Sequence, residues 1–188
     1  MKAPRILLIG LAATSLAGCA TSTVSGPVEV TRFHLGAPLE RGTIAVEPLP
    51  GGGPASLEFS TYAGAVQSEL VQAGYNPAAT GTNGQYLAVV GFTRTTLEGA
   101  PRPAPFTVGL GGGISFPIGK SKARYVVATE LSVQIRRRSD GTVIWEGRAQ
   151  TQADDRAPEA QATAAAGKLA HALFLGFPGE SGRSITVK

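Results

Sequence analysis

The chain has 188 residues and a formal net charge of +4, with one cysteine, 13 prolines and 25 glycines. A nucleic-acid-binding domain usually carries a stronger basic field, so the charge argues against that class of partner. A single cysteine excludes an intrachain disulfide and a cysteine-based zinc site, so the fold depends on packing alone.

The amino-terminal 18 residues have the pattern of a secretory signal peptide. Lys2 and Arg5 make a positively charged start, and an apolar run follows over residues 6–16. The run is too short for a membrane-spanning helix, which needs about 20 apolar residues. We therefore predict that residues 1–18 direct export and are removed. This leaves 170 residues with a formal charge of +2, enough for one domain with a core.

The four residues Leu16-Ala17-Gly18-Cys19 resemble the lipobox of bacterial lipoproteins. In that family a diacylglycerol is attached to the cysteine sulfur, a peptidase cuts directly before this residue, and the new amino terminus is acylated. A thiolate suits the first step because it is a strong nucleophile. The resemblance implies cleavage between Gly18 and Cys19 and a covalent lipid on Cys19. The alternative is an ordinary signal peptide in which the cysteine occurs by chance.

Residues 19–27 are expected to be the lipidated tether of the domain. Residues 20–27 are small and uncharged, and they span at most ~29 Å when fully extended. Among lipoproteins of Gram-negative bacteria, an aspartate after the cysteine favours retention in the inner membrane, and this chain has Ala20 there. The lipoprotein resemblance therefore implies a domain held close to the outer membrane by several acyl chains.

Residues 28–188 are predicted to form one globular domain. Strands are expected over residues 28–35 and 42–49, followed by a helix over 56–74 whose apolar residues recur at spacings of three and four. These apolar residues are Phe59, Tyr62, Ala63, Val66, Leu70 and Ala73. A strand over 84–96 follows, and the strand–helix–strand order predicts that the strands flanking the helix are parallel.

The second half of the domain is predicted to contain most of the antiparallel strands. Residues 98–122 are rich in proline and glycine and are expected to form a long irregular hairpin. Two alternating runs over 124–151 flank the tight-turn sequence at 139–141. A second helix is predicted over 154–175, with an acidic pair and a proline at its start. Residues 183–188 form either a last short strand or a loose tail.

In this order the elements predict an α/β fold of the α+β type, with one mixed β-sheet and two helices packed on one of its faces. In the run after residue 124, the more apolar of the two alternating sets is expected to face the helices. This set is Val127, Thr129, Leu131, Val133 and Ile135. Trp145 is predicted to be a core residue whose indole N–H bonds to the backbone.

The domain resembles a bacterial lipoprotein family, domain-of-unknown-function family 4136. The motifs that carry the resemblance are LVQAGY at 70–75, YLAVVGF at 86–92, DGTVIWEGRA at 140–149 and LFLGFP at 173–178. Many members also have a glycine-rich segment before the hairpin, here GLGGGISF at 109–116. These are packing and turn motifs, so the resemblance implies a fold and no particular reaction.

The residue types that carry chemistry are scattered along this sequence. His34 and His171 have no cysteine, aspartate or second histidine at ligand spacing, so no metal site is predicted. Ser115 comes closest to a nucleophile motif but lacks the last glycine of G-x-S-x-G. The glycine run at 109–114 is not followed by a Lys-Ser/Thr pair, which favours a connection between strands over a phosphate loop. We expect no cofactor besides the lipid, and no enzymatic activity.

A candidate basic surface patch is suggested by the positive residues on either side of the predicted antiparallel region. These residues are Lys120, Lys122, Arg124, Arg136 and Arg138. Together they would face anionic lipid headgroups or a glycan polymer. The alternative is that they are solvated strand ends that discourage edge-to-edge pairing.

The function that these patterns favour is a lipid-anchored envelope protein that binds another envelope protein, with no nucleic-acid partner. The sheet edge near the glycine-rich hairpin is the expected contact, because an open edge accepts a partner strand. One alternative is a carrier or sensor of a small apolar or anionic ligand, which predicts an apolar pocket under residues 101–119. Another is a hydrolase of envelope polymers, which requires clustered serine, histidine and acidic side chains.

Overall fold

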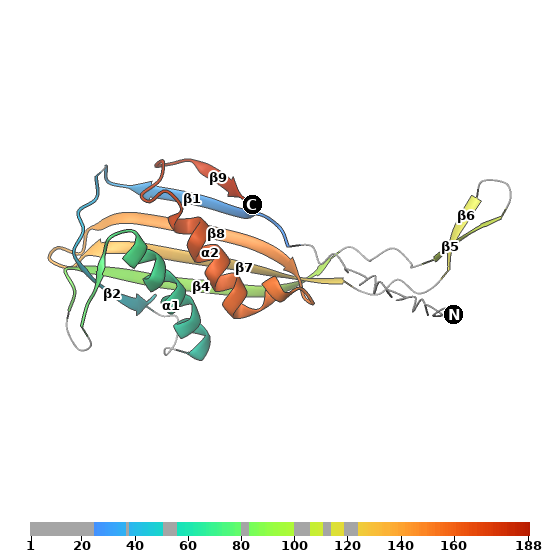
Figure 1. Ribbon diagram of the computed structural model, residues 1–188, viewed down its shortest axis with the longest axis horizontal. Helices are drawn as coiled ribbons and strands as arrows, with labels where there is room; N and C mark the ends of the chain where they lie inside the picture. Colours follow the sequence, from blue (N-terminus) through green and yellow to red (C-terminus); the bar gives the residue numbers. More distant parts are fainter. Residues whose placement is uncertain are drawn as a thin grey trace, which may run out of the picture.

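The structure is a computed structural model that describes residues 25–36, 38–50, 56–79, 83–99, 106–110, 114–118 and 124–188. A seven-stranded mixed sheet runs through it in the order β3-β2-β4-β7-β8-β1-β9, and both helices pack against one face of this sheet (Figure 1). This arrangement confirms the predicted fold class. The predicted signal peptide, with Cys19 and residues 20–24 of the predicted tether, lies outside the described residues.

The strands of the main sheet pair antiparallel except where β2 meets its two neighbours. Their bounds are β1 Val28–His34, β2 Thr43–Pro48, β3 Asn76–Pro77, β4 Tyr86–Gly99, β7 Arg124–Arg137, β8 Val143–Asp154 and β9 Ser184–Val187. The parallel pairing of β2 with β4 confirms the predicted crossover through the first helix. For residues 183–188 the sequence predicted either a short strand or a loose tail. This segment contains the strand β9, which pairs with β1.

The first helix, α1 (Leu57–Gln72), begins and ends where its sequence signals place it. The Ser56 side chain accepts a hydrogen bond of 3.0 Å from the backbone N–H of Phe59, which satisfies one of the free donors of the first turn. At the other end Gly74 has a φ of +93°, a backbone conformation that glycine adopts without strain. Tyr62, Val66 and Leu70 are the residues that α1 buries.

The second helix starts later than the sequence predicted. The strand β8 continues to Asp154, a 3-10 turn η1 follows over Pro158–Ala160, and the helix α2 spans Ala162–Phe174. Asp154 is buried and lies 3.4 Å from the Arg124 guanidinium, at the neighbouring end of β7. Asp154 is therefore the last residue of a strand, where it forms an ion pair, and it is not part of the first turn of a helix.

The core lies between the two helices and the sheet face that they cover. Trp145 is fully buried, as predicted, and its Nε1–H donates a hydrogen bond of 3.0 Å to the Pro178 carbonyl oxygen. Its ring stacks on Phe174, with ring centroids 5.3 Å apart, and lies against Phe177. The predicted helix-facing set of β7 is confirmed at Leu131, Val133 and Ile135, which are fully buried, and at Thr129.

The chain between β4 and β7 contains a separate two-stranded antiparallel sheet of β5 (Phe106–Leu110) and β6 (Ile114–Ile118). The predicted hairpin is thus present and regular in its described part. This connecting segment leaves and re-enters the main sheet at its end, where Gly99 of β4 pairs with Arg124 of β7. Figure 1 shows the two-stranded sheet beyond that end.

Candidate functional site

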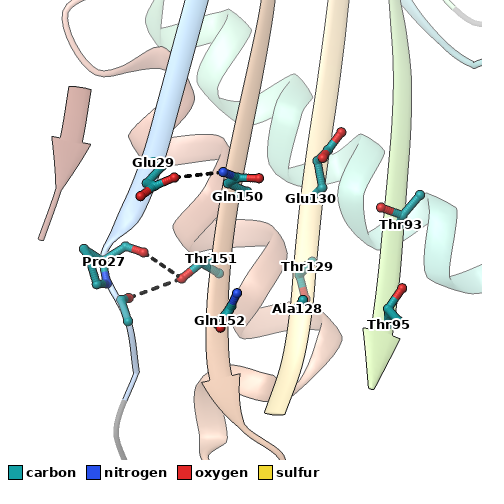
Figure 2. A pocket seen from close by; sticks show the side chains of 11 residues that line it. Pro27, Glu29, Thr93, Thr95, Ala128, Thr129, Glu130, Gln150, Thr151 and Gln152 are labelled. Atoms are coloured by element: carbon teal, nitrogen blue, oxygen red, sulfur yellow. Dashed lines mark hydrogen bonds between the residues drawn. The ribbon is translucent and has the colours of Figure 1, made fainter. Parts of the chain in front are cut away.

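The face of the main sheet opposite the helices is uncovered by any described element. Residues of β7 alternate between the two faces, so Leu131 and Val133 enter the core while Glu130 and Ser132 point the other way. Figure 2 shows this second face, with polar side chains in front of the strands and the helices behind. We call it the open face.

The open face is built of rows that run across four strands in register. One row is Glu29 on β1, Gln150 on β8, Glu130 on β7 and Thr93 on β4. The next row is Thr31, Arg148, Ser132 and Gly91. Because directly opposed residues of paired strands lie about 5 Å apart, the side chains of each row form a line of hydrogen-bonding groups, which in the second row stops at Ser132 because Gly91 has no side chain.

Several of these groups bind one another across the strands. The Gln150 amide donates a hydrogen bond of 2.8 Å to the Glu29 carboxylate, and the Arg148 guanidinium lies 3.1 Å from the Glu130 carboxylate. The side chain of Arg148 is 66% exposed and that of Glu130 is 37% exposed. Exposed pairs contribute little to stability, about 1 kcal/mol or less, so they remain available to exchange partners with a bound molecule.

The open face contains a hollow of about 450 Å³ over the row of Glu29 and Glu130. Its lining combines hydroxyl, amide and carboxylate groups with apolar surface, and the strands on both sides of it contribute (Figure 2). The lining residues are Gly26, Pro27, Glu29, Thr93, Thr95, Ala128, Thr129, Glu130, Gln150, Thr151 and Gln152. The Thr151 hydroxyl donates within this lining to the Pro27 carbonyl at 3.1 Å, which fixes the start of the described chain against β8.

Half of β4 is also an open edge. The neighbouring strand β2 ends at its pairing with Val90, and the N–H of Leu49 donates to the Val90 carbonyl oxygen at 2.9 Å. From Gly91 to Gly99 no described strand pairs with β4 on this side. Backbone groups alternate in direction along a strand, so those of Phe92 and Thr96, like those of Val90, point out of this edge. We call this segment the β4 edge.

The β4 edge borders a second hollow of about 660 Å³ that combines apolar and polar walls. Its walls include Leu49 after β2, Phe59 on α1, Phe92 and Thr93 on the strand itself, and Arg148 on β8. The Phe92 ring stacks on that of Tyr62, with centroids 4.3 Å apart, which holds the edge strand against α1. An extended chain laid along β4 would therefore meet backbone groups and pockets for side chains together.

The structure does not bring the predicted basic patch together. Arg124 begins the strand β7 and Arg136 stands near its other end, 12 residues later, which separates them by about 40 Å at the rise of a strand. Arg124 pairs with Asp154, Arg136 donates to Gln134 at 2.6 Å, and Arg138 lies 2.8 Å from Glu47. Lys120 and Lys122, the other two members, lie outside the described residues.

The two histidines occupy different places. His34 ends β1, and its ring nitrogens lie 2.9 Å and 3.2 Å from the carbonyl oxygens of Gly36 and Gly179. His171 is exposed on α2, with Nδ1 3.4 Å from Glu69 on α1. Within the described ranges no group of three or more histidine, cysteine, aspartate and glutamate side chains has the geometry to hold a metal ion. None of the helices in these ranges is long and apolar enough to cross a membrane.

Sequence reasoning missed the residues of the open face. Glu29, Glu130, Gln150 and Thr93 are ordinary polar residues at alternate strand positions, which a sequence alone assigns to solvent. One signal in the sequence could have grouped them. Each of these residues alternates with the buried residues of its own strand, so each must lie on the face of the sheet opposite the core. Only the strand order brings the four into one row.

This chain has detectable similarity to known proteins in sequence and in structure. No family model matches this chain. An uncharacterised protein of Zymomonas mobilis subsp. mobilis is 26% identical over 213 residues, which cover 86% of this chain and 80% of that protein. Among solved structures, a PDZ domain protein of Parabacteroides distasonis aligns with a TM-score of 0.48 and 12% identity. A PelC dodecamer of Paraburkholderia phytofirmans aligns with a TM-score of 0.40 and 15% identity.

These alignments differ in how much of each protein they include. The alignment to the Parabacteroides protein covers 86% of this chain but 39% of that one, so this chain spans about two fifths of its length. The alignment to PelC covers 78% of this chain and 94% of that one.

Proposed function

We propose that the protein is a lipid-anchored lipoprotein of the cell envelope, held at the outer membrane through Cys19, whose domain binds another envelope protein. The signal-peptide and lipobox patterns and the resemblance to domain-of-unknown-function family 4136 support the anchor. The observation that carries the binding role is the β4 edge, whose outer side pairs with no described strand and lies beside a hollow and a polar face.

A protein with an extended segment fits this surface best. Strand addition along β4 would satisfy the outward backbone groups of Phe92 and Thr96, which a small ligand would leave open. The adjoining rows supply carboxylate, amide and guanidinium groups, of which Glu130 and Arg148 are the most central. Tethering to the membrane raises the local concentration of the domain, which strengthens a contact that is weak in solution.

A carrier of a small apolar or anionic ligand is less well supported by the described residues. The hollow on the open face contains two carboxylates, those of Glu29 and Glu130, and these repel an anion. Its other walls include the hydroxyl and amide groups of Thr93, Thr95 and Gln152, which an apolar ligand would leave without partners. The apolar pocket expected under residues 101–119 falls partly outside the described residues.

The proposal is tested by photo-crosslinking in intact cells that express the full chain. A photoreactive benzoylphenylalanine replaces Thr95, which lies on β4 beside the open edge, or Val71, which is 48% exposed on the outer side of α1. We expect one discrete adduct with a reproducible envelope protein from the Thr95 position and none from the Val71 position. The same adduct should decrease strongly when Cys19→Ala removes the anchor.

Equal labelling from both positions would show nonspecific crowding and would contradict the proposed surface. An adduct that persists undiminished in the Cys19→Ala chain would separate the binding role from the anchor. Fractionation of the same cells shows whether each variant reaches the envelope, which distinguishes a missing partner from a mislocalised protein.

A further inference from the structure

The β4 edge offers different chemistry to the two faces of a strand added beside it. On the helix side, the Phe92 ring lines the 660 Å³ hollow together with Phe59 of α1 and Leu49. On the open face, Thr93 and Thr95 line the 450 Å³ hollow (Figure 2). Opposed residues of paired strands share one face of a sheet, so alternate residues of an added strand would meet an apolar wall and a polar wall in turn.

The open face has a negative charge, although the whole chain has a formal charge of +4. The row that follows the row of Arg148 is Phe33, Glu146, Gln134 and Val89. Over this row and the two already described, the charged side chains are the carboxylates of Glu29, Glu130 and Glu146 and the guanidinium of Arg148. Three negative charges and one positive charge leave a formal charge of −2, which favours a cationic partner on this face.

Glu130 is the carboxylate that an added strand can reach. It lies on β7 directly opposite Thr93, so a strand on the outer side of β4 would be two strand spacings, or about 10 Å, away from it. The threonine between them has a short side chain, over which the long stem of a lysine or arginine can extend. Glu130 also lies 3.1 Å from Arg148, but both side chains are exposed, so a second cation approaches without displacing a buried partner.

We propose that the partner of the β4 edge is an extended segment in which basic and apolar residues alternate. Its basic side chain lies beside Thr93 and is directed at Glu130, and the apolar side chain next to it lies against Phe92. This inference rests on the proposed function, because it specifies the chemistry of the segment that pairs with β4. The added backbone binds the outward groups of the edge, and the alternating side chains determine which segment is accepted.

A second copy of this chain would not supply these side chains through its own β4 edge. The open-face residues of this edge are Gly91, Thr93, Thr95, Leu97 and Gly99. Two copies that paired through β4 about a two-fold axis normal to the sheet would place these residues beside one another. None of them is basic, so the second copy would bring no cation to Glu130.

The test measures the binding of designed peptides to the full, processed chain in non-ionic detergent by fluorescence anisotropy, with micelles alone as the blank. Lysine and valine alternate in one fluorescein-labelled peptide, and glutamate and valine alternate in the other. A third peptide repeats the lysine sequence with every backbone nitrogen methylated, which keeps its charges and removes its backbone donors. The proteins are the wild type, Glu130→Gln and the control Glu180→Gln. Glu180 is an exposed carboxylate beside Arg183, and its substitution changes the net charge equally.

We expect the lysine peptide to bind the wild type at least fivefold more tightly than the glutamate peptide. This ratio should fall below twofold in Glu130→Gln and persist in Glu180→Gln. The methylated peptide should bind at least tenfold more weakly than its parent, because it cannot donate to the β4 edge. The inference is overturned if neither peptide binds, if both bind equally, if the preference survives Glu130→Gln, or if methylation has no effect.

The adduct from the Thr95 position reports separately on the proposed function. If a discrete envelope protein is captured there but its crosslinked segment lacks alternating basic and apolar residues, the binding role stands and the inference about the segment fails. If no adduct forms while the lysine peptide binds as expected, the preference of the surface is supported and the proposed envelope partner fails.

Discussion

At the scale of single residues, the core depends on a glycine beside the tryptophan. Trp145 and Gly147 are two positions apart on the same face of β8, and the indole lies across the space that a side chain at 147 would occupy. A Cβ at Gly147 would stand 2.6 Å from a Trp145 ring carbon and 2.8 Å from a Leu173 methyl group. Glycine is needed at position 147 because a side chain would not fit there. The backbone conformation does not require it, since φ is not in the left-handed region.

We predict that Gly147→Ala destabilises the protein by about 1–3 kcal/mol, the usual effect of overfilling a packed core. Gly167→Ala is the matched control, because Gly167 is an exposed residue of α2 with no atom within 4 Å of the added carbon. This control should be neutral or stabilising by up to about 1 kcal/mol, since alanine favours a helix. Urea unfolding measures both, and equal midpoints for the two variants would refute the packing argument.

Tyr62 has a buried hydroxyl whose titration affects stability in alkali. The residue is fully buried, and its hydroxyl has no hydrogen-bond partner among the described residues. Burial raises the pKa of Tyr62 to about 12 from a usual value of 10.0, with the Arg94 charge opposing the rise and the Glu58 charge adding to it. The unfolded chain therefore releases this proton first, and the stability that the neutral phenol provides is lost as the pH rises from 10 to 12.

We predict that Tyr62→Phe leaves stability at pH 7 unchanged or higher, because it removes a buried polar group without a partner. Between pH 10 and 11 the wild type should lose more stability than Tyr62→Phe, by on the order of 1 kcal/mol. Urea midpoints at pH 7, 10 and 11 give this difference directly. Parallel losses in the two proteins would show that the phenol of residue 62 does not titrate in this window.

At the scale of elements, the two helices are stabilised differently at their ends. Ser56 caps α1 with its side chain, whereas Gln161 stands before α2 without a side-chain hydrogen bond. Both carboxyl ends receive an arginine from elsewhere in the chain. The Arg41 Nε–H donates to the Ala73 carbonyl at 2.6 Å, and the buried Arg32 donates to the Ala172 carbonyl at 2.8 Å. Burial lowers the pKa of Arg32 below its usual value, and the free carbonyls at the end of α2 favour the positive charge there.

Opposite effects are predicted for substitutions at the two amino-terminal caps. Ser56→Ala should destabilise the protein by about 1 kcal/mol, because it removes the acceptor for the Phe59 N–H. Gln161→Ser should stabilise it by up to about 1 kcal/mol, because serine supplies the acceptor that α2 lacks. Thermal unfolding of both variants measures the effects, and a destabilised Gln161→Ser would contradict this account of α2.

The same elements show what the sequence predicts and what it does not. The period of the α1 residues and the Ser139-Asp140-Gly141 turn are local signals, and both elements form as predicted. The start of α2 was wrong, because Asp154 resembles a helix-start residue until Arg124 is brought beside it by strand pairing. The open face and the β4 edge depend on strand order and on where β2 ends, and neither is encoded in a local pattern.

At the scale of the whole molecule, the sheet separates two kinds of surface. One face is filled by α1 and α2, and the other presents polar rows and hollows that no described element covers. The described chain begins at the end of the sheet from which the β5–β6 ribbon emerges. In the proposed function this end is directed to the membrane, while the β4 edge and the open face remain accessible from the side.

The measurement that tests this account most directly is the intact mass of the protein purified from the cell envelope. The account predicts a chain of residues 19–188 whose mass exceeds that of the polypeptide by a diacylglyceryl group and an amide-linked acyl chain, all carried by Cys19. The Cys19→Ser chain should lack this added mass and should be released from the membrane fraction. A wild-type protein that retains residues 1–18, or that is cut elsewhere and carries no lipid, would contradict the central claim.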